Sequence, residues 1–425
     1  MNVADIVDQV DAGKIYQHIL KLEGTRHPIA SPQELNEAAD YIVSEFTQYG
    51  LVVNEHKFKI PHFDSTFRNI EGLIEGKDGP ELLIVSHYDT VENCPGANDN
   101  ASAVAVMLEA ARVLSKQEDL HNVRFISFTL EESNPTFVSR ARAASQRLGL
   151  TDARNRYISL KVHKTMGKFW QLYGKYWMLG NSSDEALAKT KTELETKMSD
   201  AMVKYVGEIE AINKGITATS WPGEIGAIGS SFWVERALQA NRKVLGVLCL
   251  ETIGYTSLKE YSQHFPAGMS ARKLKMLETF RKMRIPYRIL KPFLPPGVKP
   301  EMIQTHKADN LNVGNFLLIV GDANSGKLTK SFFAQCKLSS IDLPCISFQV
   351  PLRYEQIATG MSFFLRSDHA PFWRQGIPAL FLTDTADYRY PYYHTPADTI
   401  GKLDFDFMTK ICKATVATTI NLTSG

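Results

Sequence analysis

Histidine and acidic residues stand where two apolar stretches of this 425-residue chain come to an end. The run Leu82 to Ser86 leads into His87-Tyr88-Asp89, and the run Val123 to Leu130 leads into Glu131-Glu132. Asp99 follows the first run after a short loop that contains proline and glycine. Imidazole nitrogens and carboxylate oxygens are ligands that zinc accepts in proteins. The stretch from 82 to 132 therefore predicts a metal site.

Two later segments repeat the same pattern. Glu251 follows the apolar run Val247 to Leu250, and His394 lies in the segment Tyr392 to Thr399. Taken alone, His87 could be a buried core histidine, and Glu131-Glu132 could be a solvated turn. Two imidazoles and several carboxylates at strand ends form a mixed ligand set, in which one carboxylate can bridge paired metals. We expect these residues to lie together.

The elements that must position them alternate along the chain. Strands are expected at 52–60, 68–75, 82–86, 123–130, 244–250, 316–320, 344–350 and 379–383, and helical patterns at 14–50, 101–114, 271–283 and 405–422. Most of the strands are apolar throughout, which indicates burial on both faces of a mostly parallel sheet. The sequence therefore predicts an α/β fold with three layers, αβα, around a mostly parallel mixed sheet. Ligands bind such sheets at the carboxyl ends of the strands.

The segment 133–224 differs in character from the rest. It contains nine basic residues and one acid between Arg140 and Lys175, and then an apolar stripe that predicts one long amphipathic helix over 184–213. We expect an inserted helical subdomain that leaves the chain beside Glu132 and forms a lid over the site; the alternative is a helical hairpin on the surface. Residues 1–132 and 225–425 would then form the catalytic domain.

Composition restricts partners and compartment. The formal charge of +2 indicates no particular polyanionic partner, and no apolar stretch approaches the ~20 residues that span a bilayer. The acidic start of the chain lacks the pattern of a secretory signal, and five scattered cysteines are typical of reduced core thiols. We expect a cytoplasmic protein without a membrane or nucleic-acid partner. The oligomeric state is not predicted.

Two rival motifs are weaker. The segment Gly321 to Lys327 looks like a phosphate-binding loop, but Leu328 stands where a magnesium-binding Ser or Thr is needed, which favours a helix-entry loop. The basic, aromatic segment Lys161 to Trp177 could bind nucleic acid. No recognisable nucleic-acid module accompanies it, so a packed helix with solvated lysines is the preferred interpretation.

As a set, the motifs resemble the co-catalytic dizinc aminopeptidases, a family of zinc exopeptidases related to glutamate carboxypeptidase and glutaminyl cyclase. The resemblance implies the zinc-dependent exopeptidase fold and covers most of the chain outside the insertion. It is carried, in the order of the family, by His87-Tyr88-Asp89-Thr90, Pro95 to Ser102, Glu131-Glu132, Ile228-Gly229-Ser230, Leu250 to Gly254, Ser367 to Phe372 and Tyr393 to Pro396.

The resemblance also implies roles for individual residues. Asp99 would bridge two zinc ions (Zn²⁺) per chain. His87 and Glu251 would be the other ligands of one zinc ion, and Glu132 and His394 would be the other ligands of the second. Asp89 and Asp398 would accept hydrogen bonds that orient the imidazoles. Glu131 would be the general base that takes a proton from the attacking water and delivers it to the leaving amine. Tyr393 matches a tyrosine that steadies the tetrahedral oxyanion in some members.

Two departures from the family pattern stand out. The family usually has aspartate where this chain has Glu251, and the extra methylene moves the carboxylate. The Ile-Gly-Ser segment usually follows the Glu-Glu pair within a few residues, whereas here the insertion intervenes.

We therefore expect a zinc metallopeptidase, a hydrolase that acts on peptides and most simply releases residues from the amino end. A metallocarboxypeptidase would need a cation for the terminal carboxylate, which Arg366 or Arg389 could supply. A glutaminyl-cyclase-like acyltransferase is disfavoured by the full two-metal set. A non-catalytic binding module is the remaining alternative.

Overall fold

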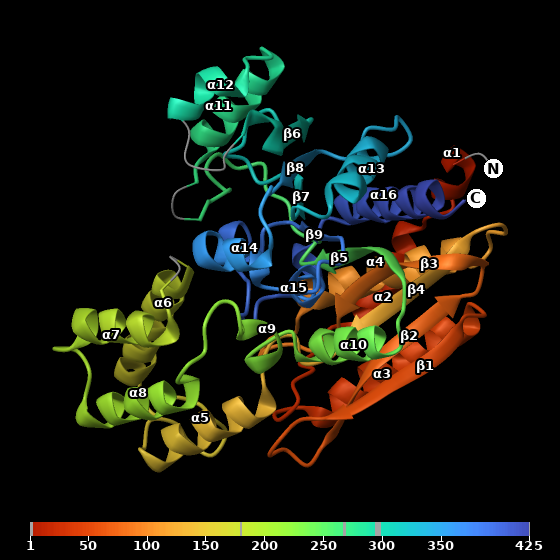
Figure 1. Ribbon diagram of the computed structural model, residues 1–425. Coiled ribbons are helices and arrows are strands. Elements are labelled where there is room, and N and C mark those ends of the chain that lie inside the picture. Colours follow the sequence, from red (N-terminus) through yellow and green to blue (C-terminus); the bar gives the residue numbers. More distant parts are fainter. Residues whose placement is uncertain (1–2, 179–180, 267–268, 294–298, 425) are drawn as a thin grey trace.

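The computed structural model describes residues 3–178, 181–266, 269–293 and 299–424. A nine-stranded sheet runs through these residues in the order β1-β2-β4-β3-β5-β9-β7-β8-β6 (Figure 1). The strands are β1 (Val52–Lys59), β2 (Thr66–Ile74), β3 (Lys77–His87), β4 (His121–Phe128), β5 (Val244–Glu251), β6 (Ile303–His306), β7 (Leu317–Gly321), β8 (Cys345–Gln349) and β9 (Ala379–Thr383).

The sheet is mixed, and its parallel part lies at the centre. Strands β4, β3, β5 and β9 pair in parallel, as do β7 and β8, whereas the β1–β2, β2–β4, β7–β9 and β6–β8 pairs are antiparallel. The predicted strands are present, and the α/β fold class is confirmed. Strand β6 was not predicted, because four residues are too few to show a period.

Helices cover both faces of the sheet and complete three layers (Figure 1). Leu82 and Ile84 of β3 pack into one core and Leu83 and Val85 into the other, which explains why this strand is apolar throughout. The first core also contains α1 (Val3–Val7), α2 (Ala12–Leu22), α3 (Pro32–Gln48), α4 (Ser102–Leu114), α13 (Gly326–Cys336) and α16 (Phe405–Thr423). The second contains α10 (Ile228–Gln239), α11 (Ala271–Lys282), α12 (Tyr287–Leu290), α14 (Tyr354–Gly360) and α15 (Ala370–Arg374). Short helical turns lie at Ala97–Ala101, Lys291–Phe293, Pro300–Met302, Ser362–Leu365, Ala386–Tyr388 and Ile400–Lys402.

The segment after Glu132 forms a separate group of helices with a core of its own. Figure 1 shows α5 (Pro135–Arg147), α6 (Leu160–Met178), α7 (Ser183–Leu194) and α8 (Asp200–Asn213) to one side of the sheet, and α9 (Trp221–Glu224) leads back to it. The prediction of one helix over 184–213 is wrong. Ser199 caps a new helix by accepting a hydrogen bond from the Met202 amide, so the apolar stripe is divided between α7 and α8.

Other expectations concern thiols and membranes. The five cysteines are buried and free, as reduced core thiols would be. Among the described residues, no helix has both the length and the apolar character needed to cross a bilayer. The Gly321 to Lys327 segment forms a turn just before α13, in which the Asp322 carboxylate accepts hydrogen bonds from the Asn324 amide and the Ser325 hydroxyl. It has the structure of a helix-entry loop.

Candidate metal centre

The carboxyl ends of the four central strands bring the predicted residues to one edge of the sheet. His87 is the last residue of β3, and Glu251 is the last residue of β5. Glu131 and Glu132 follow β4 after two further residues, and His394 lies in the loop after β9. Because these strands run in parallel, their ends meet on the same side of the molecule.

Asp99 lies between the two imidazoles. Its Oδ1 is 3.4 Å from His87 Nε2, and its Oδ2 is 3.0 Å from His394 Nε2. The outer positions are taken by Glu251, whose Oε2 is 3.3 Å from His87 Nε2, and Glu132, whose Oε2 is 3.1 Å from His394 Nε2. Each oxygen of Asp99 therefore faces a different imidazole, which is the position of a bridging carboxylate.

These donors fit zinc in number, type and spacing. Among the described residues, the buried atoms without a hydrogen-bond partner include His87 Nε2, both carboxylate oxygens of Asp99, and Glu132 Oε1. Two ligands at 2.0–2.1 Å from a tetrahedral zinc ion lie about 3.3 Å apart, close to the separations found here. Buried carboxylates in excess over cationic side chains are costly unless a cation joins them. The site therefore suits zinc.

Neighbouring acids orient this cluster. Asp89 Oδ1 lies 3.5 Å from His87 Nδ1 and accepts a hydrogen bond from the Glu131 amide, while its Oδ2 accepts from the Glu132 amide. The Asp89 carboxylate therefore contacts both the His87 imidazole and the backbone amides of Glu131 and Glu132. Asp398 accepts hydrogen bonds from the amides of Asn98 and Asp99, so its carboxylate positions the central aspartate through the backbone.

Burial and close charges shift every pKa in the cluster. Burial lowers the pKa of His394, but the carboxylates of Glu132 and Asp99 outweigh this effect and raise it to about 10. Burial raises the pKa of Asp99, yet the imidazoles of His394 and His87, 3.0 and 3.4 Å from its oxygens, hold it well below the usual range. Burial, together with the charge of Asp99, raises the pKa of Glu132 to about 7. The acids and imidazoles share protons that bound cations would displace.

Glu131 has two geometrically possible roles. Its Oε2 is 3.8 Å from His87 Nε2, and burial raises its pKa well above the usual range. The residues described here bring together two sets of possible metal ligands: His87, Glu131 and Glu251 form one, and His87, Asp99 and Glu132 form the other. By position alone, Glu131 can either bind a metal or remain free as a base.

The chain returns from the helical segment directly beside Glu131. The amide of Ala227 donates to the Glu131 carbonyl, and the amide of Gly229 donates to the Thr129 carbonyl. A Cβ on Gly229 would lie 2.2 Å from the Thr129 carbonyl oxygen, so only glycine permits this approach. The Ile228-Gly229-Ser230 segment thus supports the loop that carries the two glutamates.

One supporting residue was not predicted. The Ser367 hydroxyl donates a 2.7 Å hydrogen bond to Glu251 Oε2, and both side chains are buried. The sequence signal was present, because Ser367 begins one of the segments that carry the resemblance, but no role was assigned to it.

Tyr393 lies at the edge of the cluster. Its ring stacks on the imidazole of His394 with 3.8 Å between centroids, and its hydroxyl accepts a 3.4 Å hydrogen bond from Arg366 Nη2. The proton of this hydroxyl can therefore point elsewhere. Burial raises the pKa of Tyr393 well above its usual value, so the phenol keeps its proton.

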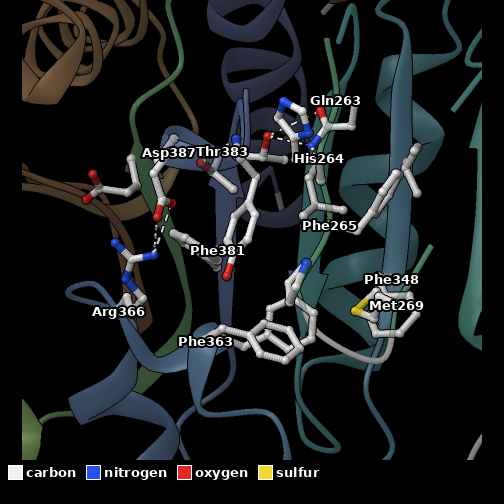
Figure 2. A pocket seen from close by; sticks show the side chains of 18 of the residues that line it. Gln263, His264, Phe265, Met269, Phe348, Phe363, Arg366, Phe381, Thr383 and Asp387 are labelled. Carbon is white, nitrogen blue, oxygen red and sulfur yellow. Dashed lines mark hydrogen bonds and ion pairs between the residues drawn. The ribbon is translucent and has the colours of Figure 1, made fainter. Parts of the chain in front are cut away.

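A largely apolar pocket opens beside Glu251 and Tyr393 (Figure 2). It has about 820 Å³ of empty space, including its open mouth. Figure 2 shows Phe348, Phe363, Phe381 and Met269 around it, with Arg366 and Asp387 paired at one side. A bulky side chain of a ligand bound at the cluster would find this space next to it.

Comparisons with known proteins agree with this architecture. A sequence model described as peptidase family M28 matches residues 69–209 and 346–419, just over half of the chain. The chain is 24% identical over 413 residues to the uncharacterized protein YfbL of Escherichia coli, covering 94% of this chain and 85% of that protein. It is 44% identical over 72 residues to the aminopeptidase YwaD of Bacillus subtilis, covering 16% of each.

Solved structures share the fold. The LapA aminopeptidase of Legionella pneumophila matches with a TM-score of 0.54 and 16% identity, covering 100% of this chain and 75% of LapA. The glutaminyl cyclase of Porphyromonas gingivalis matches with a TM-score of 0.52 and 14% identity, covering 97% and 99%. At such identities these likenesses concern the fold alone. Together with the family match, they lead to one conclusion: the chain belongs to peptidase family M28, a family of co-catalytic zinc metallopeptidases.

Proposed function

We propose that this chain is a dizinc aminopeptidase that releases residues from the amino end of peptides. The observation that carries the proposal is the position of Asp99, with one oxygen toward His87 and the other toward His394. His87, Asp99 and Glu251 would hold one zinc ion, and Asp99, Glu132 and His394 the second. When bound, zinc polarises a carbonyl group and makes a nearby water acidic enough to attack near neutral pH.

The remaining roles fall to side chains of the chain itself. Glu131 takes a proton from the attacking water as the water oxygen bonds to the carbonyl carbon. It then delivers that proton to the nitrogen that leaves when the C–N bond breaks. The Tyr393 hydroxyl, held by Arg366, donates to the carbonyl oxygen as negative charge develops on it.

The charges near the pocket favour the amino end over the carboxyl end. Binding a terminal carboxylate needs an available cation, and Arg366 is already bonded to both oxygens of Asp387 at 3.0 and 3.2 Å. Arg389 is buried and donates to Gln263 and to the Phe316 carbonyl. Arg366 is paired with an acid, and Arg389 is buried and does not line the pocket, which supports an aminopeptidase. The apolar pocket further supports substrates with a bulky apolar first residue.

We also propose that residues 133–224 form a lid subdomain. Asn155 donates a 2.9 Å hydrogen bond to Glu92, which lies in the loop between His87 and Asp99. Arg142 Nη1 is 3.7 Å from the other oxygen of the same carboxylate. The helical segment therefore contacts the loop that carries the central aspartate.

A cytoplasmic location is supported by the free, buried cysteines.

Metal analysis and blocked peptides test this function. We expect about two zinc ions per chain, loss of turnover on chelation, and recovery when zinc is added back. Peptides with an acetylated amino end should resist cleavage, whereas peptides with an amidated carboxyl end should be cleaved.

The opposite pattern of cleavage would establish a carboxypeptidase. Formation of pyroglutamate from peptides that begin with glutamine, without hydrolysis, would favour the cyclase. Full zinc content with no turnover of either kind would favour a binding protein.

A further inference from the structure

The region around α11 and α12 is strongly basic. Between Ala271 and Lys291 the chain has eight basic residues and one acid, whereas the whole chain has a formal charge of only +2. The rest of the protein therefore carries a net negative charge. Figure 1 shows α11 and α12 projecting at one end of the molecule, away from α5 to α8.

The single acid in this region does not offset the exposed basic charge. Glu278 is 1% exposed and points inward, where it pairs with Lys275 at 3.1 Å and with Lys282 at 2.8 Å. The exposed charged side chains of residues 271–291 are all basic. They include the exposed Arg272, Arg284, Arg288 and Lys291.

Helix α11 has two distinct faces. Leu274 and Leu277 are buried, and Leu274 lines the apolar pocket beside Glu251. On the opposite face, Arg272, Met276, Thr279 and Met283 follow one another at the spacing of a single helical stripe, and all four are exposed. Met276 is 39% and Met283 65% exposed. Lys273 and Lys275 flank this outer stripe.

Further exposed apolar side chains belong to the same end of the molecule. Ile289 of α12 is 55% exposed, and Leu258 and Tyr261 are 81% and 73% exposed. The loop that carries Leu258 and Tyr261 lies beside α11, because Asn310 bonds to Glu260 and Lys275 donates to the neighbouring Asp309 carbonyl. We call this surface the basic face: residues 258–261 and 271–291.

We propose that the basic face binds peripherally to the surface of an anionic lipid bilayer. Basic side chains are attracted to anionic headgroups, and each one near the surface strengthens binding roughly fivefold. Exposed methionine, leucine and isoleucine side chains between them can enter the boundary between headgroups and acyl chains, as in interfacial helices. A single-stranded nucleic acid would instead favour a row of aromatic side chains for stacking.

Peripheral binding does not need a membrane-spanning helix. It is therefore compatible with the finding that, among the described residues, no helix is long and apolar enough to cross a bilayer. It does depart from the expectation of no membrane partner, which rested on the absence of spanning segments and on the overall charge. The proposal rests instead on the local charge of the basic face and on the exposure of its side chains. The proposal does not rest on the peptidase function, because none of the residues on the basic face belongs to the metal cluster.

Sedimentation with vesicles tests the proposal on the full-length protein. We expect binding to phosphatidylcholine vesicles that contain about 30% phosphatidylserine, little binding to pure phosphatidylcholine, and release at about 0.5 M salt. The variant Arg272→Gln/Arg284→Gln/Arg288→Gln/Lys291→Gln should weaken binding by more than about tenfold. The matched control Lys161→Gln/Lys164→Gln/Lys168→Gln/Lys175→Gln removes the same charge from α6 and should bind as the parent does.

A second pair of variants tests the apolar contribution. Met283→Ser/Ile289→Ser should weaken vesicle binding, and the matched pair Ile158→Ser/Leu160→Ser, also exposed, should not. Thermal melts and peptidase assays should show that all four variants fold and turn over substrate as before. Equal losses in test and control variants would overturn the proposal. So would no vesicle binding by the parent protein, including the case in which it binds single-stranded RNA instead.

Discussion

Replacing Glu131 by glutamine distinguishes a general base from a metal ligand. The two side chains have nearly the same shape, but glutamine cannot accept the proton of the attacking water. The contact of the Glu131 carboxylate with His87 Nε2 is 3.8 Å, longer than a hydrogen bond. The substitution should therefore leave the fold and the zinc content unchanged.

The expected loss of rate follows from the role. General acid–base catalysis contributes roughly 10²- to 10⁴-fold, or about 3–5 kcal/mol of transition-state stabilisation. Glu131→Gln should lower kcat by that factor with little change in KM. The neighbouring Glu132 provides the matched control, because its Oε2 lies 3.1 Å from His394 Nε2 at the spacing of two ligands on one ion. Glu132→Gln should lower zinc content as well as kcat.

Metal content by mass spectrometry and steady-state rates on the same preparations provide the assay. The reasoning is refuted if Glu131→Gln loses zinc together with activity, since Glu131 would then be a ligand in the set it forms with His87 and Glu251. Full activity with full zinc content would remove Glu131 from the mechanism altogether.

Three further substitutions test the support of the site and the fold. Gly229→Ala would place a methyl group 2.2 Å from the Thr129 carbonyl, and should cost more than about 2 kcal/mol in urea unfolding; an unchanged midpoint would contradict the close contact. Burial lowers the pKa of His18 to about 4, below the 6.5 of the unfolded chain. The unfolded state therefore takes up a proton first as pH falls. The stability present above pH 6.5 should decline by about 3 kcal/mol toward pH 4, and unfolding curves of His18→Gln should decline less over that window. Tyr393→Phe removes one hydroxyl donor and should lower kcat by about 10²-fold at constant zinc content, whereas an unchanged kcat would exclude the oxyanion role.

The strands that carry the site could be predicted because they are buried on both faces. Residues 82–85 alternate between two cores, so this run is apolar, and its end is marked by the polar residues Ser86 and His87. Helices that bury one stripe against a neighbour also show a clear period. The boundary between α7 and α8 was missed because the stripe continues through it, and only the hydrogen bond of Ser199 reveals the new start.

The members of the site could be anticipated from chemistry, but not their distances. Sequence places His87 and His394 about three hundred positions apart, and only the parallel order of β3, β5 and β9 brings both within 3.4 Å of Asp99. The basic face was missed for a similar reason. The net charge of the whole chain is small because the positive charge of residues 271–291 is offset by negative charge elsewhere in the chain. That Glu278 points inward depends on the tertiary structure and cannot be read from the sequence.

Glu251 shows how the structure accommodates a departure from the family pattern. As the final residue of β5 it pairs with Thr383 of β9, which restrains the position of its backbone. The longer side chain must therefore be held in place at its far end. Ser367 provides this restraint, with a 2.7 Å hydrogen bond to the same oxygen that lies 3.3 Å from His87 Nε2. If Glu251 binds zinc as proposed, a glutamate and a serine together would present the ligand where an aspartate alone would be expected, because a hydrogen bond to a ligating carboxylate fixes its orientation.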